Sequence, residues 1–128
     1  MADDKKKELM IQFCIAYAGI LNKHKLCGTG ATARLVEEAT GLSVEHYLGG
    51  EQGGGEQVGA RMQCDEIDML IYFRDMQGSA QIGDEPEQSL LRICDAHNIP
   101  YATNLASAEV MIMALQRGDL DWRMNLKK

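Results

Sequence analysis

The chain has 128 residues, of which 45% are hydrophobic and 25% charged, and it carries a net charge of −6 with a pI near 5.0. This balance is typical of a folded globular protein, and the length suits a single domain over residues 1–128 with a core of its own. The acidic charge argues against nucleic acid or an anionic membrane as the main partner, and no apolar run approaches the roughly 18 residues that span a bilayer.

The cysteine usage indicates a reducing compartment. The four cysteines are widely spaced and include no C-x-x-C pair: Cys14, Cys27, Cys64 and Cys94. We expect them to be small buried hydrophobic residues in the cytoplasm, with neither a metal site nor a disulfide framework. The N-terminus shows no apolar core of a signal peptide.

The first predicted element is a helix over residues 5–24, where apolar residues recur at three- and four-residue spacing from Leu9 to Leu21. It opens with Lys5-Lys6-Lys7, at the end where the helix dipole disfavours cations. Either this is a solvated charge run, or one lysine faces a bound anion at that helix end.

A strand, a glycine–threonine turn and a helix come next. The short strand Lys25-Leu26-Cys27 leads into Gly28-Thr29-Gly30-Ala31-Thr32, and the helix that follows is predicted to stop near Gly41. This order is typical of a phosphate cradle, because backbone N–H groups and threonine hydroxyls converge at a helix N-terminus. A plain helix entry is the alternative.

A strand is predicted over residues 43–48, in which His46 is expected to be a partly exposed strand residue and not a ligand. It runs into the most glycine-rich part of the chain, residues 49–59, which holds six of the 13 glycines. Such a cluster is typical of a loop whose backbone approaches an anion before a helix begins. The alternative is a flexible surface linker.

The clearest strand is predicted over residues 67–73, because its near-continuous apolar run suits a parallel strand that is covered on both faces. Asp75 follows it directly. In an open parallel sheet the ligand crevice lies at the carboxyl ends of the strands, so Asp75 is well placed for a site. A structural turn or cap is the alternative for this residue.

The rest of the chain continues the alternation. A polar loop over 76–86 precedes a helix over about 87–97, a short strand over 99–103, and a helix that Asn104 caps and that runs to Gly118. His97 is expected to close its helix structurally, and Trp122 to pack on a neighbouring surface. We therefore predict an α/β fold, doubly wound around a mostly parallel sheet.

Six segments together resemble the methylglyoxal synthase family, at matching intervals from about residue 2 to residue 122. They are Lys5-Lys6-Lys7, Gly28-Thr29-Gly30-Ala31-Thr32, Glu38-Ala39-Thr40-Gly41-Leu42, the stretch 49–59, Phe73-Arg74-Asp75, and Ile99-Pro100-Tyr101-Ala102-Thr103-Asn104. The resemblance implies a Rossmann-like fold, a homohexamer, and conversion of dihydroxyacetone phosphate to methylglyoxal and inorganic phosphate without metal or organic cofactor.

The resemblance also implies a set of phosphate- and substrate-binding residues. The family usually has threonine at the position of Ala31, a Ser-Gly loop at the position of Gly49 and Gly50, and a histidine at the position of Asp3. The implied binding residues are Asp3, Lys7, Thr29, Gly30, Ala31, Thr32, Gly49 and Gly50.

The catalytic positions of the family are altered. Its general-base aspartate falls on Gly55, with Glu56 one residue later, and its oxyanion histidine falls in a loop that has no histidine here. Four carboxylates could replace the base: Glu56, Asp75, Asp84 and Glu87. The first hypothesis is a lyase with Glu56 as base and Asp75 in support. The second is a catalytically weak or inactive phosphate-ligand binding or regulatory domain of the same fold.

Family members open with an apolar strand, whereas the match in this sequence starts near Met1. We therefore expect the sheet to lack an interior strand. That would expose apolar surface and unpaired strand edges, which a partner could cover.

Overall fold

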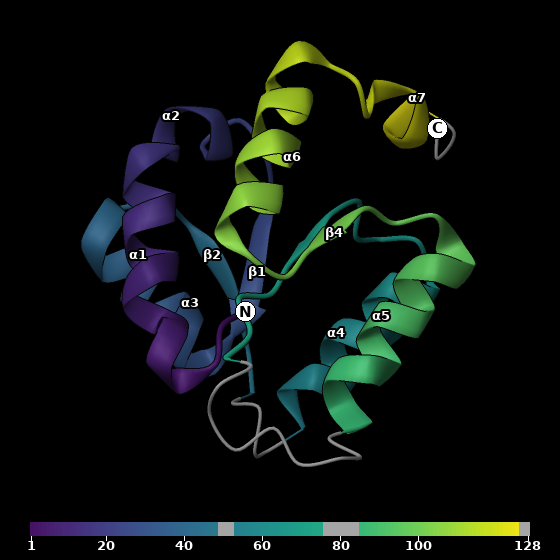
Figure 1. The fold of residues 1–128 in the computed structure, drawn as a ribbon, viewed down its shortest axis with the longest axis horizontal. Coiled ribbons are helices and arrows are strands. Elements are labelled where there is room, and N and C mark those ends of the chain that lie inside the picture. Colours follow the sequence, from purple (N-terminus) through teal and green to yellow (C-terminus); the bar gives the residue numbers. More distant parts are fainter. Residues whose placement is uncertain (49–52, 76–84, 126–128) are drawn as a thin grey trace.

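The computed structural model describes residues 1–48, 53–75 and 85–125. Helices and strands alternate within them, which gives the predicted α/β fold (Figure 1). In chain order the elements are η1 (a 3-10 turn, Asp4–Lys6), α1 (Lys7–Ala16), α2 (Ala18–Leu21), β1 (Leu26–Thr29), α3 (Gly30–Thr40), β2 (Val44–Tyr47), α4 (Gly54–Gln63), β3 (Leu70–Ile71), α5 (Glu85–His97), β4 (Tyr101–Ala102), α6 (Leu105–Arg117) and α7 (Asp121–Asn125).

The strands form two parallel pairs. β1 pairs with β2 from Leu26↔Val44 to Thr29↔Tyr47, and β3 pairs with β4 through Leu70↔Tyr101 and Ile71↔Ala102. Beyond β3, Ala2 forms a parallel bridge with Phe73. One helix connects the two strands of each pair: α3 connects β1 to β2, and α5 lies between β3 and β4 in the chain. Parallel neighbouring strands need such a crossover connection, because their ends cannot be joined by a tight hairpin.

The two pairs are separate sheets in the described part of the chain. A cavity of about 750 Å³ lies between them, lined from one side by Leu26 and Cys27 of β1 and from the other by Leu70 and Ile71 of β3.

Two hydrophobic clusters lie on opposite sides of the strands. The first joins α1, α3 and α6, and in it the rings of Phe13 and Phe73 pack edge to face with centroids 5.7 Å apart. The second joins α4 and α5 around the fully buried Met62 and Cys94. Burial of each large apolar side chain contributes about 1.5–3 kcal/mol, so both helix layers are held on the strands. This confirms the doubly wound arrangement.

Several helix ends follow their sequence signals. Gly41 ends α3 and Gly118 ends α6, both in left-handed conformation with φ of 75° and 84°. The Asn104 side chain accepts a hydrogen bond from the Ser107 backbone N–H at 2.9 Å and caps α6, as predicted. No helix of the described residues combines the length and the apolar character needed to cross a bilayer.

Some predicted elements were wrong in extent. The helix expected over 5–24 is broken at Tyr17, which lies between α1 and α2 with φ −114° and ψ 21°. The Tyr17 hydroxyl donates a hydrogen bond to Glu109 of α6 at 2.7 Å, and Gly19 weakens the following turn. The strand expected over 67–73 is reduced to Leu70–Ile71, because the partner strand β4 is only two residues long.

Two expectations about burial were also wrong. Trp122 is 56% exposed and does not pack on a neighbouring surface. Cys14 and Cys94 are buried as expected, but Cys27 and Cys64 are exposed. All four cysteines are free thiols.

Candidate functional site

The predicted phosphate cradle is built as a strand end that turns directly into a helix. Thr29 is the last residue of β1 and the N-cap of α3, with an extended backbone (φ −72°, ψ 152°), and the helix begins at Gly30. Thr29 and Thr32 are buried. The first-turn N–H groups of a helix have no partner within the helix, so this end suits an anion.

The described end of the glycine-rich stretch packs against this helix start. The α4 helix begins at Gly54, and a Cβ atom there would lie 1.8 Å from the Leu48 carbonyl oxygen and 3.0 Å from the Thr29 methyl carbon. The Gln57 side chain accepts a hydrogen bond from the Leu48 backbone N–H at 2.7 Å. Only a residue without a side chain allows this approach, so the described end of the stretch is a packed element and not a linker.

The N-terminal residues are fixed on the carboxyl end of β3. The two Asp3 carboxylate oxygens accept hydrogen bonds from the Tyr72 hydroxyl at 2.9 Å and from the Asp75 backbone N–H at 2.8 Å. Lys7 is the first residue of α1, and its ammonium lies 3.5 Å from the Ala2 carbonyl oxygen. Asp3, Lys7 and Asp75, which the sequence singles out separately, thus belong to one corner of the molecule.

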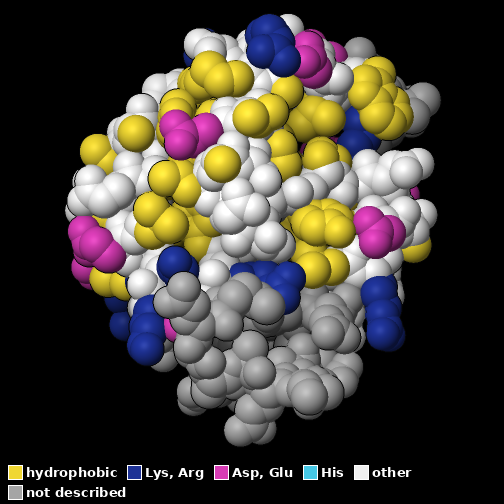
Figure 2. Space-filling model, in the orientation of Figure 1, with side chains coloured by type: hydrophobic (Ala, Val, Ile, Leu, Met, Phe, Trp, Pro, Cys, Tyr) yellow, Lys and Arg dark blue, Asp and Glu magenta, His cyan; other side chains and the backbone are white. Residues whose placement is uncertain are grey.

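The starts of α1, α4 and α5 lie toward the lower end of the molecule in Figure 1. Lys and Arg side chains lie on the described surface beside this end (Figure 2). The carboxyl ends of parallel strands meet at such an edge, which is where α/β sheets bind their ligands.

The candidate bases differ in exposure and in the direction of their side chains. Glu56 is exposed on the first turn of α4. A Cβ atom at Gly55 would meet nothing within 4 Å, so that position faces open space. Consecutive helix positions point about 100° apart, so Glu56 and a side chain at Gly55 would point in different directions. Glu87 lies in the first turn of α5. Three predicted site residues lie outside the described residues: Gly49, Gly50 and Asp84.

Two polar groups of this region were missed by the sequence reasoning. Tyr72 was counted as an apolar strand residue, and Gln57 was not singled out. The regular alternation of a strand could have flagged Tyr72, since it stands next to Phe73 and must point to the other face. Nothing in the sequence pairs it with Asp3, which is 69 residues away.

His46 has the structural role that was expected. It is exposed on β2 and hydrogen bonds with the Glu37 carboxylate of α3. A hydrogen bond from the Val44 backbone N–H, followed by the one to His46, lowers the pKa of Glu37. In the described ranges no three His, Cys, Asp or Glu residues are grouped so that they could hold a metal ion.

Comparisons with known proteins identify relatives of this chain. The family model described as MGS-like domain matches residues 10–103. The methylglyoxal synthase of Caldicellulosiruptor saccharolyticus is 54% identical over 123 residues, which are 96% of this chain and 86% of that protein. That of Thermoanaerobacterium thermosaccharolyticum is 50% identical over 127 residues, 99% of this chain and 94% of the relative. The crystal structure of methylglyoxal synthase from Elizabethkingia anophelis NUHP1 superposes with a TM-score of 0.80 at 34% identity, covering 88% of this chain and 73% of that one.

Proposed function

Because the chain belongs to the MGS-like domain family, and within it to the methylglyoxal synthases, we propose that it is a lyase that converts dihydroxyacetone phosphate into methylglyoxal and inorganic phosphate. The observation that carries the proposal is the close meeting of the Thr29–Thr32 helix start with Gly54. This meeting supports an anion site at the start of α3, because the first-turn N–H groups of a helix favour negative charge.

In this proposal the phosphate of the substrate lies at the start of α3. Backbone N–H groups of Ala31 and Thr32 and the hydroxyl of Thr29 would donate to its oxygens, and Lys7 would add a positive charge. Gly30, whose N–H donates to the Leu48 carbonyl oxygen at 3.4 Å, would let the backbone come close to the phosphate. A helix N-terminus favours negative charge through its unsatisfied N–H groups and its dipole. Gly49, Gly50 and Asp3 complete the proposed binding set.

The reaction needs a base and a stabilised oxyanion. A carboxylate removes a proton from the hydroxymethyl carbon beside the carbonyl, and the electron pair forms an ene-diolate whose charge rests on the former carbonyl oxygen. A proton shift between the two oxygens then places the charge on the oxygen of the former hydroxymethyl carbon. This oxygen forms the aldehyde C=O, the C=C bond shifts to the phosphate-bearing carbon, and its C–O bond breaks to release phosphate. The enol that remains takes up a proton on its CH2 carbon and becomes methylglyoxal. Fixed donors at the oxyanion lower the barrier.

We assign the base to Glu56, supported by Asp75, because Glu56 lies one residue from the position where the family has its aspartate. Asp75 is held by Asp3 at the end of β3. Asp84 and Glu87 are the further carboxylates proposed for the site. We also propose that the protein acts in the cytoplasm, which its free thiols suit, and as a homo-oligomer, a hexamer by resemblance.

The first experiment measures methylglyoxal and phosphate together after dihydroxyacetone phosphate is added to concentrated protein. The proposal expects both products in equal amounts. No product above the rate without protein, with a rise in melting temperature on adding substrate, would contradict the lyase and identify a binding domain.

The second experiment tests the base with three variants. Glu56→Gln should lower kcat by about 10²–10⁴-fold, as removal of a general base does. Gly55→Asp in the Glu56→Gln background should recover activity, because the position has open space for a carboxylate. Glu38→Gln, another exposed glutamate on a helix, is the matched control and should not change kcat. Full turnover by Glu56→Gln would remove Glu56 from this role.

A further inference from the structure

The backbone of Leu48 is the point where the end of β2 meets the starts of α3 and α4. Its carbonyl oxygen accepts a hydrogen bond at 3.4 Å from the N–H of Gly30, the first residue of α3. The same oxygen lies 1.8 Å from the place where a Cβ atom of Gly54, the first residue of α4, would stand. A shift of Leu48 would therefore move the helix start at which we place the phosphate.

A side chain of α4 holds Leu48 in this place. The register between β1 and β2 ends at Thr29↔Tyr47, so Leu48 lies one residue beyond it. Its own side chain is 49% exposed, so packing fixes it only in part. Its N–H donates to the Gln57 side-chain oxygen at 2.7 Å, which is a short bond for an N–H donor. Gln57 is itself fixed by the helix, because its N–H donates to the Gly53 carbonyl oxygen at 3.2 Å.

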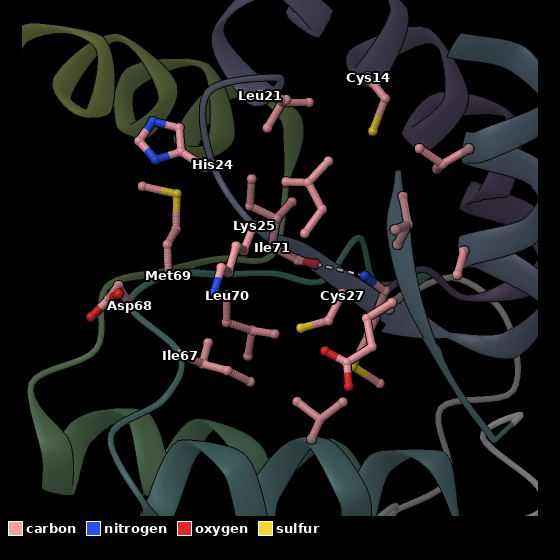
Figure 3. A pocket seen from close by; sticks show the side chains of 18 of the residues that line it. Cys14, Leu21, His24, Lys25, Cys27, Ile67, Asp68, Met69, Leu70 and Ile71 are labelled. Carbon is pink, nitrogen blue, oxygen red and sulfur yellow. Dashed lines mark hydrogen bonds between the residues drawn. The ribbon is translucent and has the colours of Figure 1, made fainter. Parts of the chain in front are cut away.

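Gln57 lies outside the phosphate site that it would influence. It lines a hollow of about 490 Å³ on the β2 side of α4, together with Arg61. Among the described residues, none of the proposed phosphate contacts at the start of α3 lines this hollow. Neither Gln57 nor Leu48 lines the larger cavity that Figure 3 shows beside Cys27 and Leu70. We therefore expect any effect of Gln57 on a bound phosphate to pass through Leu48.

The bond between Gly30 and Leu48 also selects the donors that an anion meets. The first N–H groups of a helix have no acceptor within it, and Leu48 takes that of Gly30. The N–H groups of Ala31 and Thr32 come next, at the end of the helix that favours negative charge. The place of Leu48 thus helps to set where this pair of donors lies.

We propose that Gln57 is a positioning residue for the phosphate site: it holds the Leu48 backbone, which in turn places the start of α3. This role rests on the proposed function of the site and deepens it. Because Gln57 does not touch the substrate, its loss weakens binding and leaves the chemical step unchanged. An amide oxygen suits the task, since it accepts the Leu48 N–H without bringing a negative charge toward a bound anion.

Three variants of α4 separate this role from a general loosening of the helix. Gln57→Met keeps the length of the side chain and removes the amide oxygen. Gln57→Glu keeps an acceptor and adds a negative charge, which salt screens. Arg61→Met removes a second link from the same helix face to β2, the bond from Arg61 to Glu45 at 2.5 Å, one turn further along α4.

Inorganic phosphate is the probe, titrated by calorimetry, and KM and kcat are measured with dihydroxyacetone phosphate. Gln57→Met should raise the phosphate Kd and the KM by about tenfold and leave kcat within about twofold, because only binding is lost. Gln57→Glu should recover most of this loss in about 0.5 M salt, relative to the parent chain at the same salt. Arg61→Met should lower the melting temperature and keep the Kd of the parent chain.

Amide hydrogen exchange gives a readout that needs no turnover. Exchange at Leu48 and Gly30 should quicken in Gln57→Met and stay as in the parent chain in Gln57→Glu. Unchanged exchange at Leu48 in Gln57→Met would contradict the hold of Gln57 on this backbone.

Binding of phosphate by the parent chain separates the two possible failures. An unchanged Kd in Gln57→Met, an equal loss in Arg61→Met, or no recovery in Gln57→Glu would overturn the positioning role and leave the lyase standing. Phosphate binding by the parent chain without any product would contradict the lyase, and the Kd values of the variants would still decide the role of Gln57. A parent chain that binds no phosphate would contradict both.

Discussion

Gly54 shows how a single absent side chain shapes the site. A Cβ atom at this position would overlap the Leu48 carbonyl oxygen, whereas one at Gly55 would meet open space. Gly54→Ala should therefore push the start of α4 away from the end of β1. We expect a loss of about 1–3 kcal/mol in the free energy of unfolding, typical of overpacking, together with weaker substrate binding.

Gly55→Ala is the control for this prediction. Alanine in a helix is more favourable than glycine by roughly 0.5–1 kcal/mol, so Gly55→Ala should stabilise the protein slightly. Urea unfolding of both variants would check the opposite signs. Equal stability of Gly54→Ala and the parent chain would show that the close approach is not needed.

The Met1 amino group gives the chain that begins there a pH dependence. Its pKa is about 6 in the folded protein, lowered by burial from 8.0. Between about pH 6 and 8 the unfolded chain binds a proton that the folded chain releases, so stability should rise with pH across this window by up to roughly 2–3 kcal/mol.

Urea unfolding from pH 5.5 to 8.5 would measure this rise. Acetylation of the N-terminus removes the titrating charge and should flatten that part of the curve. An unchanged slope after acetylation would mean that other groups cause it.

At the residue scale, the sequence predicted the local geometry of the candidate site but not its long-range contacts. The strand end and helix start at Thr29 could be predicted because a strand–turn–helix signal is local. The contact of Gly54 with Leu48, and the bonds from Asp3 to Tyr72 and Asp75, join segments that only tertiary packing brings together.

At the scale of elements, the cap of α6 is a clear test. The Asn104 side chain accepts from the Ser107 backbone N–H, which otherwise lacks a partner at the helix start. Asn104→Ala should cost about 1 kcal/mol in the free energy of unfolding. Ser107→Ala keeps the backbone donor and serves as the control, with a change near zero. A loss of equal size in both variants would contradict the cap as the cause.

Apart from the short elements η1, α2 and α7, the helices and strands were predicted in order and type, because periodicity and glycine stops are strong local signals. Their lengths were not. β3 is shorter than its apolar run, whereas β1 extends past Cys27 to Thr29, because backbone pairing and not the apolar run sets the end of a strand. At the break, the Tyr17 hydroxyl bonds to the distant Glu109, which no local pattern predicts. The short helix α7 has no apolar periodicity that would predict it.

At the scale of the whole molecule, one buried arginine holds the C-terminal helix in place. Arg123 is 5% exposed and donates to the Asp68 carboxylate at 2.6 Å and to the His97 and Asn98 carbonyl oxygens at 3.1 and 3.2 Å. Arg123→Leu should cost about 2–3 kcal/mol, because it removes the donor of the half-buried Asp68 carboxylate and of two backbone carbonyl oxygens.

Arg117 offers the matched comparison. Its pair with Asp119 is exposed, so Arg117→Leu should cost at most about 1 kcal/mol. Urea unfolding followed by circular dichroism measures both, and the emission of Trp122, the only tryptophan, reports α7 separately. Similar losses for the two variants would contradict the role of Arg123 as the anchor of α7.

The gap between the strand pairs has a consequence for how the protein folds and opens. Each pair with its helix is a unit that is local in sequence, over residues 26–47 and 70–102, and no ladder of hydrogen bonds joins the described part of one unit to the other. Units of this kind open independently, with separate free energies. Native-state hydrogen exchange should therefore resolve two cooperative openings, and a single opening shared by both units would contradict their independence.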